Sequence, residues 1–248
     1  MLALLGALKE ELAGIKRLMA IEETISEQGC QVYKGKYQGR GILLAQTGMG
    51  REKAEFAASF VLQRYPVTTL VSFGFAGALT GELKVGDVIL CSTLACGEGM
   101  PGLHKSCQCD ISLVTLLAEA MEEKGFSFQL GTSVSVIQPV SSPEAKQALG
   151  QTFAADIVDM ESYWLARIAA DRGIPFLAIR AISDEVSASL APFDRIMTPD
   201  GKWRWQKAVP YYISHPTGVG KLLHLSRDAG RARKSLTEAV SILLASMN

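Results

Sequence analysis

Apolar and polar positions alternate along the chain in a pattern that predicts strands and helices in turn. Short apolar runs of strand length end in glycine, proline or polar residues, and longer segments between them repeat their apolar positions with helical spacing. The expected strands are 2–6, 30–37, 41–47, 69–79, 85–95, 128–137, 154–160 and 174–183. The expected helices are 48–65, 111–125, 141–150 and 161–173.

This alternation predicts an α/β protein, with a mostly parallel or mixed sheet covered by helices on both faces. No linker interrupts the chain, so we expect residues 1–248 to form a single domain. Residues 188–248 lack a strand pattern and are expected to form a helical C-terminal extension of that domain. The extension contains Trp203, Trp205, Tyr211 and Tyr212, and residues 221–234 carry a local net charge of +4.

Composition excludes few classes of protein. The chain has 25 basic and 25 acidic residues, so its net charge gives no argument for a nucleic-acid partner. The N-terminus has no basic region before its apolar run, and no apolar run approaches the roughly 20 residues of a membrane-spanning helix. Five cysteines, an odd number, indicate reduced thiols, and we expect a cytoplasmic location.

One motif raises the question of a metal. His104, Cys107 and Cys109 form H-x-x-C-x-C, but no second ligand pair with zinc-like spacing accompanies them. A loop that happens to hold these residues is the favoured interpretation, and no metal or cofactor is expected. A metal-binding or redox protein remains an alternative.

Candidate chemistry lies where the predicted strands end. In α/β sheets ligands bind at the carboxyl ends of the strands, and five segments of this chain bring polar side chains or bare backbone there. They are Glu10–Glu11, Thr47–Gly50, Gly74–Ala78, Asp159–Glu161 and Ser183–Glu185. Their convergence predicts a pocket at this edge.

Each of these features has a plain structural interpretation as well. Gly48 and Gly50 lack the full dinucleotide-binding fingerprint, so taken alone they are more typical of a tight turn than of a ligand site. Acidic residues such as Glu11 and Glu161 are common in the first turn of a helix, where they favour the helix dipole. The three carboxylates Glu11, Glu161 and Asp184 are harder to explain in this way when they share one edge.

The segments "GALKEEL", "TGMGREKAEFAA", "GFAGAL…LKVGDVIL" and "VDMES…IPFLAIRAISDE" resemble, in order, the signatures of the nucleoside phosphorylase / methylthioadenosine–adenosylhomocysteine nucleosidase family. The resemblance covers roughly residues 2–187. It implies a three-layer α/β/α sandwich with a central twisted mixed sheet. It also implies cleavage of the N-glycosidic bond of a purine nucleoside and assembly into a homodimer or larger homo-oligomer.

The resemblance also assigns roles. It implies that Glu11 is the base that activates water and that Asp184, with a raised pKa, is the acid that protonates the purine. Met160 and Glu161 match the ribose-binding pair. Ser183 and Arg180 match neighbours that help orient Asp184 and are expected at the substrate. The other positions expected to bind the substrate are Phe75, Ala76, Gly77, Gly48 and Gly50.

Charge favours hydrolysis over phosphorolysis. Phosphate needs a cluster of cations, yet Arg51 is the basic residue beside the glycine loop, and Glu11 would repel phosphate. A phosphate-dependent phosphorylase and a non-catalytic nucleoside-binding module remain alternatives.

The nature of the 5′ substituent is a separate question. The family often has serine at the position of Phe75, and its "SGDxF" segment is replaced here by "TSVSVIQP". The segments "VDMESYWLARIAADRGIPF", "TPDG" and the basic "RDAGRARKS" together resemble the hopanoid-biosynthesis-associated branch, whose members release adenine from adenosylhopane. A lipid-linked nucleoside and peripheral membrane contact through the basic segment are the corresponding expectations. Methylthioadenosine or adenosylhomocysteine is the alternative substrate.

Overall fold

The computed structural model of the protein describes residues 1–98, 105–189 and 217–247, with side chains of the last helix described from Asp228 onward. The strands are β1 (Leu2–Gly6), β2 (Ala20–Glu27), β3 (Cys30–Tyr37), β4 (Arg40–Gln46), β5 (Thr69–Ala78), β6 (Val88–Cys96), β7 (Ser106–Gln108), β8 (Gln129–Ser135), β9 (Ile157–Asp159) and β10 (Phe176–Asp184). The helices are α1 (Lys9–Leu18), α2 (Arg51–Arg64), α3 (Ile111–Glu123), α4 (Pro143–Phe153), α5 (Ser162–Ala170) and α8 (Thr217–Ser246).

The strands form one mixed sheet that partly closes on itself. The order is β10-β6-β8-β9-β5-β1-β4-β3-β2, and β10 also pairs with β5. β1 runs parallel to β4 and β5, and β5 runs parallel to β10, so the carboxyl ends of these four strands meet at one edge. The register places Gly6 beside Gln46, and Asp184 beside Gly77.

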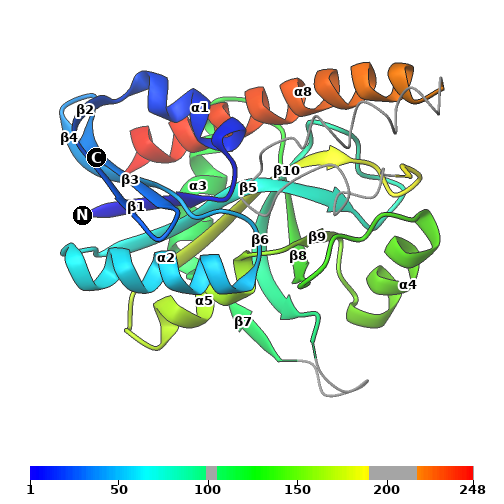
Figure 1. Ribbon diagram of the computed structural model, residues 1–248, viewed down its shortest axis with the longest axis horizontal. Helices are drawn as coiled ribbons and strands as arrows, with labels where there is room; N and C mark the ends of the chain where they lie inside the picture. The colour runs from blue at the N-terminus through cyan, green and yellow to red at the C-terminus, as the bar shows by residue number, and fades with distance from the viewer. Residues whose placement is uncertain (99–104, 190–216, 248) are drawn as a thin grey trace.

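Helices cover both faces of this sheet (Figure 1). α8 packs against β5 and β10 with α1 and α3 beside it, whereas α2 and α5 pack together on the other side. α3 shows why these segments are helical: Asp110 caps its first turn, and Val114, Leu117 and Met121 recur on one buried face. The predicted fold, a mixed sheet between helices with a C-terminal helix, is confirmed.

Three elements were not predicted, namely α1, β2 and β7. β2 is an edge strand whose side chains are exposed or partly exposed along its whole length, so it has no alternation of buried and exposed positions to reveal it. It is held by its antiparallel pairing with β3. The aromatic residues of the tail from Trp203 to Tyr212 lie outside the described residues.

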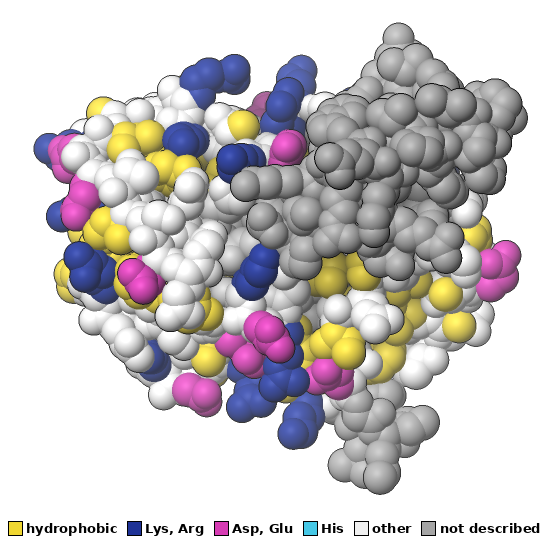
Figure 2. Space-filling view, viewed as in Figure 1, with side chains coloured by type: hydrophobic (Ala, Val, Ile, Leu, Met, Phe, Trp, Pro, Cys, Tyr) yellow, Lys and Arg dark blue, Asp and Glu magenta, His cyan; other side chains and the backbone are white. Residues whose placement is uncertain are grey.

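The described surface carries both signs of charge. Lys and Arg side chains are interspersed with Asp and Glu on the face shown in Figure 2, in keeping with the zero net charge of the chain. Arg231, Arg233 and Lys234 of α8 are exposed. In the described part of the chain, no helix combines the length and the apolar character that crossing a membrane requires.

The packing of α8 predicts that the C-terminal helix belongs to the same cooperative unit as the sheet. Leu243 is fully buried, so Leu243→Ala is expected to lower the free energy of unfolding by about 2–5 kcal/mol. Denaturant titration should show one transition shifted to lower concentration, and Arg233→Ala, at an exposed position, should shift it little. A separate early transition for α8 would contradict the single-domain prediction.

Candidate active site

Glu11 is a buried carboxyl held by main-chain amides. It lies in the first turn of α1, directly after β1, and is 4% exposed. Its Oε2 accepts hydrogen bonds from the N–H groups of Ala7 at 2.7 Å and Leu8 at 2.8 Å, and its Oε1 accepts one from Phe75 at 2.8 Å. Burial raises the pKa of Glu11, while these amides and the charge of Arg180 oppose the rise. The result is a rigidly placed carboxyl suited to accepting a proton.

Glycine at position 74 makes this placement possible. A Cβ atom at Gly74 would lie 2.7 Å from Oε1 of Glu11 and 3.1 Å from its Cδ, which is closer than real contacts allow. The missing side chain of β5 therefore leaves the space that the Glu11 carboxyl occupies.

Glu161 reaches the same region from the start of α5. It is the N-cap of α5, directly beyond β9, and its Oε1 accepts a hydrogen bond from the N–H of Gly50 at 2.8 Å. Burial, followed by the negative charge of Asp159, raises the pKa of Glu161 to about 8. The neighbouring Met160 is partly buried against the small apolar cluster that contains Val158.

The glycine turn before α2 makes its hydrogen bonds within the protein. The N–H of Gly48 donates to the carbonyl of Ala7 at 3.1 Å, and the N–H of Gly50 donates to Glu161. Both glycines have positive φ, 83° and 90°, which a residue with a side chain would adopt at a cost. This differs from the expectation that these amides are presented to a ligand: here they position Glu161 and the turn itself.

Arg180, which is expected to help orient Asp184, forms a buried ion pair with Asp159. Its Nε donates to Oδ2 of Asp159 at 3.0 Å, its Nη2 donates to Ser72 Oγ at 2.7 Å, and its Nη1 donates to the Ile179 carbonyl. Asp159 also accepts hydrogen bonds from three buried hydroxyls, those of Ser133, Ser135 and Ser162. Burial alone would raise the pKa of Asp159, but Arg180 and these hydroxyls outweigh it and lower that pKa.

Glu11 and Glu161 face one narrow cavity, and Arg180 lies in its wall. The described residues that line it are Leu5, Gly6, Ala7, Glu11, Thr47, Ser72, Phe73, Gly74, Glu161, Leu165 and Arg180. They come from β1, α1, the β4–α2 turn, β5, α5 and β10, and four of the five segments expected at this edge contribute a residue, whereas Ser183–Glu185 does not.

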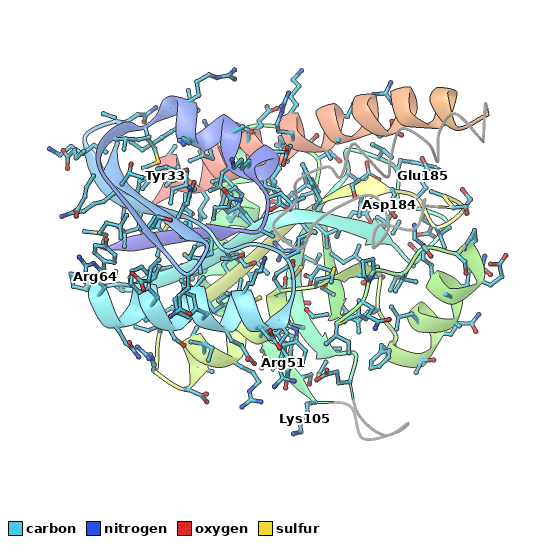
Figure 3. All side chains as sticks on the ribbon, in the orientation of Figure 1. Tyr33, Arg51, Arg64, Lys105, Asp184 and Glu185 are labelled. Carbon is cyan, nitrogen blue, oxygen red and sulfur yellow. The ribbon has the colours of Figure 1, made fainter. Side chains whose placement is uncertain are left out.

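Asp184 lies further along the same edge, outside the lining of that cavity. It pairs with Gly77 of β5, three residues beyond the Gly74 that accommodates Glu11, or roughly 10 Å along the strand. Ser183 Oγ lies 2.7 Å from Oδ1 of Asp184 and 3.3 Å from the Ala76 carbonyl. The β5 segment from Gly74 to Gly77 therefore runs from the carboxyl group of Glu11 to that of Asp184. Asp184 is labelled in Figure 3.

Lys146 of α4 was missed by the sequence analysis. Its side chain is fully buried and its Nζ forms an ion pair with Oδ2 of Asp184. The signal was its spacing: Lys146, Leu149 and Phe153 fall at i, i+3 and i+7, so the lysine lies on the inward face of α4.

Arg51, the cation considered for phosphate, is engaged elsewhere. Its guanidinium pairs with Glu55 at 3.1 Å and Glu98 at 2.8 Å, and it stacks over the ring of Trp164 at 4.4 Å from the ring centroid. Arg51 is labelled in Figure 3. Of the motif considered for a metal, His104 lies outside the described residues, while Cys107 is partly exposed in β7 and Cys109 is buried. Among the described residues no cluster of three His, Cys, Asp or Glu could hold a metal ion.

The comparisons with known proteins identify the family. The sequence matches the family model of the phosphorylase superfamily over residues 1–198, so the chain belongs to that superfamily. The 5′-methylthioadenosine/S-adenosylhomocysteine nucleosidase of Tolumonas auensis is 25% identical over 196 residues, covering 74% of this chain and 85% of the relative. The enzyme of that name from Oceanobacillus iheyensis is 24% identical over 214 residues, covering 81% of this chain and 93% of that relative.

Solved structures show the same fold. Futalosine hydrolase of Helicobacter pylori aligns with a TM-score of 0.78 and 20% identity over 98% of this chain and 97% of that chain. The 5′-methylthioadenosine/S-adenosylhomocysteine nucleosidase of Neisseria meningitidis, in complex with methylthio-immucillin-A, aligns with a TM-score of 0.77 and 21% identity. That alignment also covers 98% of this chain and 97% of the other. The names of the two sequence relatives agree with the predicted class of enzyme, an N-glycosyl hydrolase.

The close approach at Gly74 predicts a stability effect. Gly74→Ala is expected to displace the Glu11 carboxyl from its three amides and to lower the free energy of unfolding by about 1–3 kcal/mol. Gly81→Ala is the matched control, because nothing lies within 4 Å of its Cβ position. Thermal denaturation of both variants checks this, and equal melting temperatures would contradict it.

The raised pKa of Glu161 predicts a pH dependence of stability. In the unfolded chain Glu161 loses its proton near the ordinary value of 4.5, whereas in the folded protein it keeps the proton to about 8. Between these values the folded state binds more protons, so this residue makes stability fall as pH rises through that window. Glu161→Gln should therefore raise the melting temperature, relative to wild type, more at about pH 9 than at about pH 5. An equal difference at both pH values would contradict it.

Proposed function

We propose that the protein is a purine nucleosidase that hydrolyses the N-glycosidic bond of an adenosine derivative and releases adenine. The observation that carries the proposal is that Glu11 and Glu161, from distant parts of the chain, face one cavity at the sheet edge where Asp184 also ends its strand. The nucleosidase relatives support the same class of reaction.

The proposed roles follow the charges that develop during the reaction. As the bond to the base breaks, positive charge grows on the ribose and the base leaves with the bonding electron pair. Glu11 takes a proton from the attacking water, for which a buried carboxyl with a raised pKa is suited. Glu161, beside Met160, binds the ribose hydroxyls. Asp184 gives its proton to the base, with Ser183 holding one of its oxygens.

The charges of the cavity favour water over phosphate as the nucleophile. Of the described residues in the cavity wall, Glu11 and Glu161 are acidic and Arg180 is basic, and Arg180 is already paired with Asp159. Arg51 is paired with two glutamates. Neither of these two arginines is therefore left unengaged to hold a phosphate ion.

For the substrate, we propose an adenosine derivative with a large apolar 5′ substituent, adenosylhopane in hopanoid biosynthesis. Phe75 supports this, since a phenyl side chain stands where the family often has serine. Methylthioadenosine and adenosylhomocysteine are the second candidates, which the names of the relatives favour. A cytoplasmic location, a homodimer and membrane contact through the basic C-terminal segment remain predictions from the sequence.

A panel of three nucleosides tests the proposal. Adenosylhopane, methylthioadenosine and adenosylhomocysteine are incubated with the protein, with and without inorganic phosphate, and adenine is quantified by chromatography. We expect adenine release that does not depend on phosphate and is fastest with adenosylhopane. Asp184→Asn is the control for enzyme-catalysed release and should be slower by at least roughly tenfold.

Each other outcome has a definite meaning. Release that requires phosphate would identify a phosphorylase, and faster release from the two thioethers would overturn the lipid assignment. Equilibrium binding of the nucleosides without release over hours would identify a binding module and overturn the enzymatic proposal.

A further inference from the structure

Lys146 is a buried lysine that contacts Asp184, the residue proposed to protonate the leaving base. The reaction as proposed above gives Lys146 no role. Within α4, all of which the structure describes, Lys146 is the buried residue, and the other positions are exposed or partly exposed. Taking an ammonium group out of water is costly unless it is paired and hydrogen-bonded. A surface helix that inserts a lysine at its inward position therefore needs a compensating interaction.

The compensation comes from the end of β10. Nζ of Lys146 forms an ion pair with Oδ2 of Asp184 and donates a hydrogen bond to the Glu185 carbonyl at 2.8 Å. The other oxygen of Asp184 lies 2.7 Å from Ser183 Oγ. Both carboxyl oxygens of Asp184 thus have partners from different elements, which fixes the plane of the carboxyl group.

Strand β5 leaves space for the Asp184 carboxyl group at Gly77. A Cβ atom at Gly77 would lie 2.9 Å from Oδ2 of Asp184, so the absence of a side chain there lets the carboxyl rest on β5. The neighbouring Glu185 turns outward and pairs with the exposed Lys84 at 3.0 Å. Two adjacent carboxylates therefore pair with two lysines, one inside the protein and one at its surface.

We propose that Lys146 is a positioning residue for Asp184; this inference rests on the proposed function. It fixes the carboxyl group and stabilises the carboxylate that forms when Asp184 gives up its proton. In that step the O–H bond of Asp184 breaks, an N–H bond forms on the purine, and the electron pair of the glycosidic bond leaves with the base. The positive charge of Lys146 lies beside the carboxylate that this step leaves behind and stabilises the negative charge that develops there.

Two substitutions separate charge from packing. Lys146→Met keeps the length of the side chain but removes its charge, whereas Lys146→Arg keeps the charge but is bulkier. If the charge acts on Asp184, kcat for adenine release falls by at least roughly tenfold in Lys146→Met. KM should change little, and Lys146→Arg should be the faster of the two variants. The nucleoside of the three-member panel that wild type cleaves fastest is the probe.

Lys84→Met is the matched control, because it removes the same charge from the adjacent carboxylate at the surface, and its kcat should stay near that of wild type. A kcat for Lys146→Met within about threefold of wild type, or a Met variant at least as fast as the Arg variant, would overturn the proposal. If Lys146→Met does not fold, Lys146→Met/Asp184→Asn removes both charges. That double variant should match Asp184→Asn in kcat, and a further loss beyond Asp184→Asn would overturn the proposal.

The outcomes also separate this inference from the proposed function. A wild-type protein that releases no adenine would overturn the nucleosidase proposal itself. Active wild type together with an active Lys146→Met variant would overturn the role of Lys146 alone.

Discussion

The buried ion pair between Asp159 and Arg180 is the interaction on which the candidate site depends. It joins the end of β9 to the middle of β10, and Ser72 of β5 and Ser162 of α5 bond to the same pair. A buried ion pair stabilises a fold only when further hydrogen bonds satisfy the charges, and here buried hydroxyls supply them. The start of α5, and with it Glu161, is fixed relative to the sheet by this network.

The same network sets the electrostatics of the cavity. Asp159 keeps its charge because Arg180 and the hydroxyls stabilise it, and that charge in turn raises the pKa of Glu161. Arg180 acts on Glu11 in the opposite direction, since its positive charge opposes the rise caused by burial. Two carboxyls of the same type in one cavity therefore experience different fields, which is how a site obtains groups with different proton affinities.

The sequence predicted the fold and much of the arrangement at the strand ends, because both follow from apolar spacing and parallel topology. It did not reveal β2, whose exposed side chains have no periodicity. It did not reveal the partner of Arg180 either, since Asp159 lies 21 residues away and the serines that complete the network come from β5, β8 and α5. The buried position of Lys146 was also hard to predict from the sequence. Its helical spacing was readable, but a lysine is usually on the solvated face of a helix, and its partner lies 38 residues away.

The way Glu11 is held bears on how this architecture can diversify. Every position of a chain except proline has a main-chain N–H, so the carboxyl depends on where Ala7, Leu8 and Phe75 lie rather than on which side chains they carry. These hydrogen bonds therefore do not specify the side chains at the three positions, and it is packing that limits them, since Ala7 is buried and Phe75 packs against the core. Gly6 and Gly74 are limited more strictly, because the space a Cβ atom would need is already filled. Libraries that seek new nucleoside specificities on this scaffold would do well to vary the three positions within the limits of packing and leave the two glycines unchanged.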